Sequence, residues 1–223
     1  GSLNMILHLK QVIDPDTLTA VREKLAGQTF TDGKLTAGWA AKGLKNNQQL
    51  EKTKAADGII ELLLKRMRAA SGVDSAMRPK QFARVMINRY AEGEFYGMHM
   101  DDALMAGIRT DISFTLGLTS LPDYTGGALT IDDSSGQRSW RLDAGDLLIY
   151  PSHYLHQVEP VEHGERLAMV GWVQSLVRDP QQREILFDLQ AAVKTEHELN
   201  GHSEQFFRLT KSYQNLLRRW ADR

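Results

Sequence analysis

The stretch TDISFTLGL (110–118) decides how the middle of this chain folds. Every second position belongs to one set, which comprises Thr110, Ile112, Phe114, Leu116 and Leu118. The positions between them are polar residues or glycine. Side chains two residues apart share a face of a β-strand, so this alternation predicts a strand with one apolar face.

Strand-like segments extend from this stretch in both directions. Before it, residues 82–90 alternate in the same way, and one face carries Phe82, Arg84, Met86, Asn88 and Tyr90. After it come shorter segments at 128–131, 137–142, 147–150, 155–161 and 167–174, separated by turn-forming residues. About eight short strands at this spacing are typical of an all-β sandwich or jelly roll.

Helical patterns precede the strands. Asp14-Pro15 combines a helix N-cap with proline at the first helical position, and residues 29–50 are typical of loop with short strands. A second helix has an apolar face of Ile59, Ile60, Leu63 and Met67, with Leu50 as a candidate early member and Gly72 at its end.

Helical patterns also follow the strands. Asp179-Pro180 repeats the N-cap and proline signal, and Asn200-Gly201 closes the helix that it begins. Ser203 is positioned to cap a last helix. The two C-terminal helices could either cap the barrel or form a dimer contact. A homodimer is therefore one candidate assembly.

Together these patterns predict an α+β protein: a double-stranded β-helix (a jelly roll or cupin-like barrel) flanked by N-terminal and C-terminal helices. The expected division is a helical and loop support region at 5–78, a jelly-roll core at 79–177 and a helical extension at 178–223.

Composition excludes several classes of protein. The 223 residues include no cysteine, which excludes disulfides, a cysteine nucleophile, iron–sulfur clusters and thiolate zinc sites. Any metal must be held by His, Asp or Glu. The 27 Lys and Arg nearly balance the 28 Asp and Glu, so no nucleic acid or anionic membrane is indicated as a partner. With no apolar stretch near 20 residues and no leader pattern, we expect a cytoplasmic protein.

One pair of potential metal ligands stands out among the seven histidines. If His99-Met100-Asp101 is extended, its imidazole and carboxylate point to the same face. A third ligand would complete a two-His, one-carboxylate triad, which leaves positions open on ferrous iron. Strand phase favours His156 as that ligand, because His153 follows Pro151-Ser152 in a turn and His163 lies next to Gly164 in the following turn.

Arg166 opens another strand whose face continues with small or apolar residues. An arginine on an inward apolar face is costly unless it meets an anion. A guanidinium can grip a carboxylate through two parallel hydrogen bonds. That carboxylate could belong to a ligand, or to an internal Asp or Glu in a structural salt bridge.

The order HMD (99–101), His156 and Arg166 resembles that of the Fe(II)- and 2-oxoglutarate-dependent dioxygenases. NRYAEGEFYGMHMDD (88–102) looks like the prolyl 4-hydroxylase branch, in which a tyrosine at the position of Tyr90 helps bind 2-oxoglutarate. That branch usually has lysine where this chain has Arg166. KNNQQL (45–50), YTGGALTI (124–131) and ERLAMVGWVQSLVRD (165–179) resemble the bacterial PKHD-type hydroxylases, some of which are associated with iron uptake.

This resemblance implies an enzyme. His99, Asp101 and His156 would hold Fe(II), and Arg166, assisted by Tyr90, would bind the distal carboxylate of 2-oxoglutarate. O2 would oxidise an unknown primary substrate, either a peptidyl residue or an iron-uptake-related small molecule, with release of succinate and CO2. L-Ascorbate would keep the iron reduced. The resemblance implies no separate general acid or base.

Two other classes of function remain open. A metal hydrolase on the same ligands would need a general base, for which the sequence offers no clear candidate. A non-enzymatic jelly-roll protein that binds a metal or an organic acid as a sensor is the main alternative.

Overall fold

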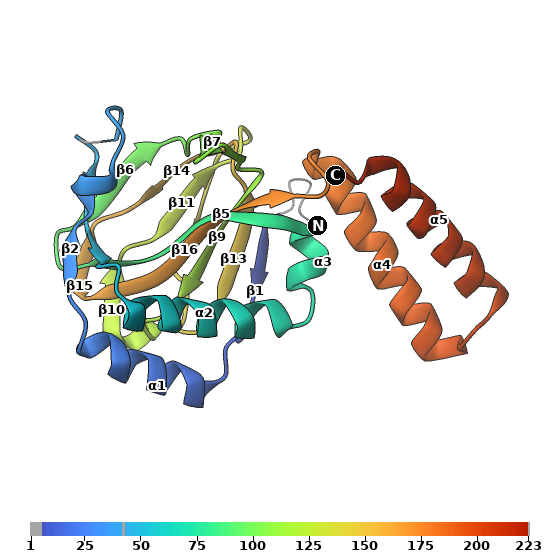
Figure 1. Cartoon of the computed structure of the whole chain (residues 1–223), viewed down its shortest axis with the longest axis horizontal. Helices are drawn as coiled ribbons and strands as arrows, with labels where there is room; N and C mark the ends of the chain where they lie inside the picture. The colour runs from blue at the N-terminus through green and yellow to red at the C-terminus, as the bar shows by residue number, and fades with distance from the viewer. Residues whose placement is uncertain (1–5, 42, 223) are drawn as a thin grey trace.

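The computed structural model describes residues 6–41 and 43–222, so the expected start of the support region at residue 5 lies outside the described residues. Two facing antiparallel sheets form a barrel, and a helical hairpin projects from its side (Figure 1). The helices are α1 (Pro15–Ala26), η1 (Gly33–Thr36), α2 (Lys54–Ala69), α3 (Val73–Met77), η2 (Leu121–Asp123), α4 (Pro180–Asn200) and α5 (Glu204–Trp220).

The larger sheet has the strand order β1-β13-β9-β16-β5-β4-β2. Its strands are β1 (Leu7–Leu9), β13 (Leu147–Pro151), β9 (Ile112–Gly117), β16 (Arg166–Ser175), β5 (Pro79–Tyr90), β4 (Gln48–Leu50) and β2 (Phe30–Asp32). β16 pairs with both β5 and β9, which places Arg166 opposite Tyr90 and Trp172 opposite Arg84. These pairs lie on the face turned toward the second sheet.

The smaller sheet has the order β12-β11-β14-β6-β3. Its strands are β12 (Gln137–Trp140), β11 (Leu129–Asp132), β14 (Leu155–Val158), β6 (Phe95–His99) and β3 (Lys45–Asn46). Two further ladders join β10 (Tyr124–Gly126) to β15 (Val161–Gly164) and β7 (Leu104–Met105) to β8 (Ile108–Arg109). Apolar contacts hold the two sheets together, because each sheet turns residues such as Leu148 and Ile131 toward the other.

Helices α1 and α2 lie along the outer face of the larger sheet (Figure 1). They bury Leu18, Val21, Leu63 and Met67 against strand residues such as Phe114 in the main apolar core. Burial of such side chains, each worth about 1.5–3 kcal/mol, holds these helices on the sheet. The predicted start of α1 is confirmed: the Asp14 carboxylate accepts a hydrogen bond from the Thr17 amide.

Two details of the expected support region are wrong. Leu50 belongs to β4 rather than to α2, which begins only after its N-cap Thr53. α2 ends at Ala69, and Gly72 instead caps the start of the short helix α3, with a left-handed φ of 86°. Such a φ favours glycine, so the glycine marks a turn between two helices rather than the last turn of one.

The expected alternation of 82–90 also changes at one position. A β-bulge between Trp172 and Val173 pairs Phe82 with Val173, while Arg84 stays opposite Trp172. Phe82 therefore packs edge-on against Phe114 in the helix-covered core, away from the face of Arg84. The segment 155–161 is likewise divided, since β14 ends at Val158 and His163 lies in the separate strand β15 rather than in a turn.

The C-terminal helices α4 and α5 pack against each other around Val177, Leu186 and Tyr213. Their expected caps are confirmed at Asp179 and Ser203. Figure 1 shows the hairpin projecting away from the barrel, so it does not cap the barrel. The dimer contact remains a prediction.

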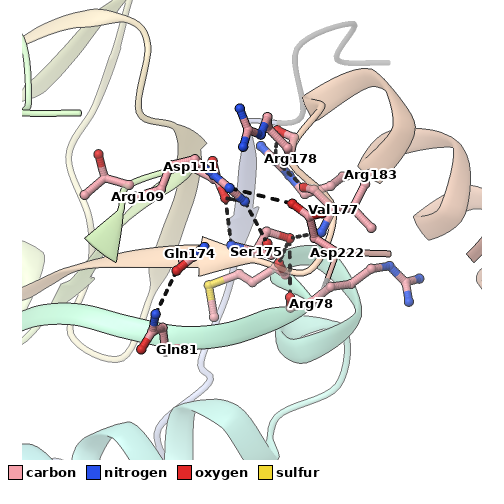
Figure 2. Close-up of polar contacts among 12 residues, drawn as sticks. Arg78, Gln81, Arg109, Asp111, Gln174, Ser175, Val177, Arg178, Arg183 and Asp222 are labelled. Atoms are coloured by element: carbon pink, nitrogen blue, oxygen red, sulfur yellow. Dashed lines mark hydrogen bonds and ion pairs between the residues drawn. The ribbon is translucent and has the colours of Figure 1, made fainter. Parts of the chain in front are cut away.

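Polar contacts surround the root of the hairpin, where the chain leaves the barrel (Figure 2). Arg109 donates to both carboxylate oxygens of Asp111 at 2.7 and 3.0 Å, and the Ser175 amide donates to Asp111 Oδ2 at 2.9 Å. Arg183 of α4 is buried and donates to the carbonyls of Val177 and Arg178, both at 2.9 Å. At the hairpin root, the side chains of Arg109, Asp111 and Arg183 therefore have hydrogen-bond partners within the protein.

Candidate active site

Three potential metal ligands meet inside the barrel. His99 ends β6, Asp101 follows it, and His156 lies on the neighbouring strand β14, directly opposite His99. Asp101 Oδ1 lies 3.7 Å from His99 Nε2 and 3.4 Å from His156 Nε2. One ligand atom from each residue lies within 4.8 Å of the others. The strand phase that favoured His156 thus agrees with the pairing of the two strands.

Hydrogen bonds orient both imidazole rings. The Nδ1 atoms of His99 and His156 lie 2.7 and 3.1 Å from the carbonyl oxygens of Gly97 and Tyr154. A carbonyl oxygen can only accept, so Nδ1 carries the proton in each neutral ring and Nε2 keeps its lone pair. Both lone pairs are therefore available on the side of Asp101. Two imidazole nitrogens and one carboxylate oxygen fit a divalent iron-type metal.

The Asp101 carboxylate is held from the other sheet. Its Oδ2 accepts a hydrogen bond from Ser113 Oγ at 2.8 Å, and Ser113 Oγ is also 2.8 Å from Ser152 Oγ. Burial raises the pKa of Asp101, but the neighbouring His156, Trp172 and His99 together outweigh burial and lower the pKa to about 2. Asp101 is therefore an anion, as a metal ligand must be.

The environments of the two histidines differ. Burial, followed by the nearby His156, lowers the pKa of His99 to about 4. Burial also lowers the pKa of His156, but interaction with the charged Asp101 has the larger net effect and raises that pKa above its usual value. The other two candidates lie elsewhere: His153 is exposed in the turn after β13, and His163 is exposed on β15.

Arg166 lies deep in the same interior. It is 5% exposed, and its Cζ lies 5.3 Å from the centroid of the Tyr90 ring. Among residues 6–41 and 43–222, no carboxylate lies within ion-pair distance of Arg166. The structure therefore provides no internal salt bridge of the kind that the sequence left open. Gly127 makes room for this side chain, because a Cβ there would lie 3.0 Å from Arg166 Cδ.

A cavity of about 600 Å³ joins these features. Its sheet wall is a ladder of facing pairs that runs from Tyr90 and Arg166, past Met86 and Val170, to Arg84 and Trp172. The metal-ligand triad lies on the wall formed by the smaller sheet. The volume is that of a small-molecule site rather than of a packing defect.

Sequence reasoning missed several residues of this cavity. They are Lys45, Arg84, Asn88, Tyr96, Ser113 and Tyr150. Arg84 and Asn88 could have been found, because they share the strand face of Tyr90. Tyr96 stacks on the His99 ring with the ring centroids 3.5 Å apart. The two residues are three positions apart, and strand alternation would place them on opposite faces. Lys45 arrives from an edge strand, which no local pattern connects with the site.

Asn47 explains part of the KNNQQL block. It is 2% exposed and lies against Gly33, where a Cβ would come within 1.8 Å of Asn47 Oδ1. The Gly33 amide also donates to the Asn47 carbonyl at 2.9 Å. Asn47 therefore requires glycine at position 33, and it fixes the turn that leads to the cavity-lining loop.

Comparison with known proteins now decides the family. Residues 85–174 match the 2OG-Fe(II) oxygenase superfamily, and residues 180–222 match the PKHD-type hydroxylase C-terminal domain. The chain is 57% identical over 218 residues to a PKHD-type hydroxylase of Idiomarina loihiensis, covering 98% of this chain and all of that protein. A second PKHD-type hydroxylase, from Picosynechococcus, is 42% identical over 219 residues, with 98% and 100% of the two chains covered.

The chain belongs to the PKHD-type hydroxylase family. It is a 2-oxoglutarate-dependent dioxygenase, and the family implies Fe(II), 2-oxoglutarate, O2 and a substrate to be oxidised.

Solved structures support the fold of this PKHD-type hydroxylase. A Pseudomonas putida prolyl-4-hydroxylase is 20% identical with a TM-score of 0.56, covering 77% of this chain and 93% of that one. HygX from Streptomyces hygroscopicus, solved with nickel and 2-oxoglutarate bound, is 12% identical with a TM-score of 0.58, covering 78% and 85%. The expected jelly roll is therefore confirmed. In the described part of the chain, no helix is both long and apolar enough to span a membrane.

Proposed function

We propose that this PKHD-type hydroxylase binds Fe(II) through His99, Asp101 and His156 and binds 2-oxoglutarate through Arg166 and Tyr90. It would hydroxylate a peptidyl residue or an iron-uptake-related small molecule. One observation carries the proposal: a cavity with three converging metal-type donors also contains a buried arginine that has no carboxylate partner among the described residues. A dicarboxylate ligand that also reaches a metal satisfies both groups at once.

Each residue has a separate task in this proposal. The Asp101 carboxylate and the two Nε2 lone pairs hold the metal. Arg166 fixes the distal carboxylate of the cosubstrate by charge-assisted hydrogen bonds, and Tyr90 donates its hydroxyl proton to the same group. Burial raises the pKa of Tyr90, which keeps that hydroxyl protonated and able to donate. When bound, iron and 2-oxoglutarate together supply oxygen activation, with release of succinate and CO2.

These groups are shielded from bulk solvent. Tyr90, His156 and Arg166 are each at most 5% exposed, so charge interactions inside the cavity are screened little. We include L-ascorbate in the proposal as the reductant that keeps the iron ferrous. The division into a support region (5–78), a core (79–177) and a C-terminal extension (178–223) is likewise part of the proposal.

Anaerobic titration of the Fe(II)-protein with 2-oxoglutarate tests the binding step. A weak visible absorption band should appear on addition and should saturate, because the cosubstrate joins the metal. A protein in which His153 is replaced by alanine is the matched control, since this histidine is exposed and outside the cavity. Absence of the band at saturating cosubstrate would contradict the proposal.

Turnover is tested separately from binding. The loaded protein is incubated with O2, ascorbate and a cell extract, and mass spectrometry searches for products that have gained one oxygen atom. Succinate should form in proportion to those products. A protein that binds both Fe(II) and 2-oxoglutarate but forms no succinate would instead support the metal- or organic-acid-binding alternative.

A further inference from the structure

The cavity contains two cations that the proposed iron and cosubstrate sites do not use. Lys45 comes from β3 at the edge of the smaller sheet, and Arg84 comes from β5 of the larger sheet. Both line the cavity, on opposite walls. In the part of the chain that the structure describes, neither has a carboxylate within 4.0 Å.

Lys45 is buried, and the described part of the chain gives it no ion pair. It is 7% exposed, its Nζ is 3.5 Å from Thr36 Oγ1, and it lies 5.5 Å from the centroid of the Tyr96 ring. Burial lowers its pKa, and the charge of Arg84 lowers it further, while Asp101 and Asp32 act in the other direction from beyond ion-pair distance. Burying an unpaired ammonium costs stability, so its position calls for a ligand.

Arg84 lies far from Arg166 along the sheet. The two side chains belong to facing strands, but Arg84 lies six residues along β5 from Tyr90, the partner of Arg166. Six residues of a strand span about 20 Å, far more than the length of a five-carbon diacid. Arg84 is exposed and stands beside Trp172, whereas Arg166 is buried.

The charges that line the cavity do not cancel. Three cations, Lys45, Arg84 and Arg166, face two carboxylates, Asp101 and Asp102. Fe(II) adds two positive charges and the dianionic cosubstrate removes two. The loaded cavity therefore keeps one net positive charge, and Lys45 and Arg84 are the cations that the proposed iron and cosubstrate sites leave unused.

We propose that the primary substrate of this enzyme is an amphipathic monoanion whose carboxylate binds Lys45 and Arg84. Its apolar part would lie among Met86, Met100 and Trp172, which also line the cavity, with the carbon to be oxidised beside the triad. This inference rests on the proposed function and adds the chemical class of the substrate. Binding of the substrate carboxylate would offset the cost of burying Lys45 without an ion pair among the described residues.

A matched pair of probes tests the inference. N-acetylphenylalanine and its neutral amide, N-acetylphenylalaninamide, are titrated by calorimetry into the anaerobic protein loaded with Fe(II) and saturating 2-oxoglutarate. The cosubstrate band is recorded first, so that Arg166 and the metal are known to be occupied. The carboxylate should bind about tenfold more tightly than the amide, as a charge-assisted hydrogen bond provides.

Variants assign that preference to the two cations. Lys45→Met keeps the length and apolar stem of the side chain, and it should reduce the preference for the carboxylate to about twofold or less. Arg84→Gln should reduce it by a smaller factor because Arg84 is exposed. Lys24→Met, on the exposed face of α1, removes the same charge outside the cavity and should leave the preference intact. Lys45→Met should also raise the Tm of the unloaded protein.

Different results overturn different claims. If the cosubstrate band forms but the two probes bind equally, or neither binds, the inference about the substrate is wrong and the proposed function stands. A tenfold preference that survives both Lys45→Met and Arg84→Gln also overturns it. If the band itself never forms in the unaltered protein, the proposed function fails and the inference fails with it.

Discussion

Arg166 and Arg183 are the same residue type, are buried to nearly the same extent and differ entirely in what surrounds them. Arg166 is 5% exposed and Arg183 is 2% exposed. Arg183 donates to the carbonyls of Val177 and Arg178 at the root of the C-terminal hairpin (Figure 2). The side chain of Arg166 has no hydrogen bond or ion pair within the described residues and only overlies the Tyr90 ring.

This difference separates a cation that stabilises the fold from one that is available to a ligand. Burial lowers the pKa of Arg183 to about 10, which leaves it charged at neutral pH, and main-chain oxygens compensate for part of the lost water. Nothing in the described chain does the same for Arg166. The presence of partners, rather than burial, therefore distinguishes the two roles, and the following experiments test that distinction.

The largest effect is expected from His99→Ala. Metal affinity should fall by about a hundredfold or more, because a ligand atom is lost from a three-residue set. Equilibrium dialysis with Fe(II) under anaerobic conditions measures this loss. His153→Ala, the exposed histidine outside the cavity, is the control. Equal metal binding by the His99→Ala and His153→Ala proteins would remove the basis for a metal centre in the barrel.

Arg166→Ala should weaken 2-oxoglutarate binding while metal binding remains. The loss should be tens- to hundreds-fold, since an unpaired carboxylate costs roughly 2–4 kcal/mol. Titration of the visible band gives the Kd. The matched control is Arg183→Ala, which removes an equally buried arginine from the hairpin root. If Arg166→Ala binds the cosubstrate normally, the unpaired arginine is not its site.

Arg183→Met should destabilise the fold and leave 2-oxoglutarate binding unchanged. It leaves the carbonyls of Val177 and Arg178 without their donor, so the free energy of unfolding should fall by about 2 kcal/mol. Urea denaturation measures this change. The Kd for 2-oxoglutarate should stay within about twofold, because Arg183 is outside the cavity. Weakened cosubstrate binding by a folded Arg183→Met protein would mean that the two regions are coupled and that the comparison is too simple.

Ser113→Ala should give the smallest effect. Ser113 donates to the Asp101 carboxylate and does not itself belong to the triad, so metal affinity should fall by only about tenfold. Competition with a metal-binding dye gives the affinity. Ser139→Ala, which removes a hydroxyl paired with Thr130 on the smaller sheet, is the control. A Ser113→Ala loss as large as that for His99→Ala would indicate that the hydroxyl determines the fold of the site rather than the orientation of Asp101.

Much of the fold was predictable because the strands are amphipathic and short. The alternation at 110–118 and the caps at Asp14, Asp179 and Ser203 are local signals, and each corresponds to an observed element. The errors have local causes as well. Leu50 fits a helical apolar pattern but pairs with Phe30 in a sheet, and a bulge moves Phe82 to the helix-covered face. Neither sheet pairing nor a bulge is visible in the spacing of one segment.

The candidate site was predictable only in part. His99, Asp101, His156 and Arg166 each follow from strand phase within one segment, helped by a family resemblance. Their roles stay predictions until the metal and the cosubstrate are bound. Lys45 and Tyr96 were not predictable, because an edge strand and an irregular pairing within β6 bring them to the cavity. Ser113 was noticed only as the polar face of a strand, and its bond to Asp101 crosses from one sheet to the other.

The sequence by itself determined the chemistry that is available: no thiolates, a His-x-Asp pair at strand spacing, and an arginine on an apolar strand face. These are properties of composition and of neighbours along the chain. Only the tertiary structure decided which charges are paired. Arg183 donates hydrogen bonds to main-chain carbonyls, whereas Arg166 and Lys45 line a cavity. This difference arises because pairing depends on which faces of distant strands are packed together. Residues far apart in the chain must be brought within a few ångströms before a cation can be assigned to the fold or to a ligand.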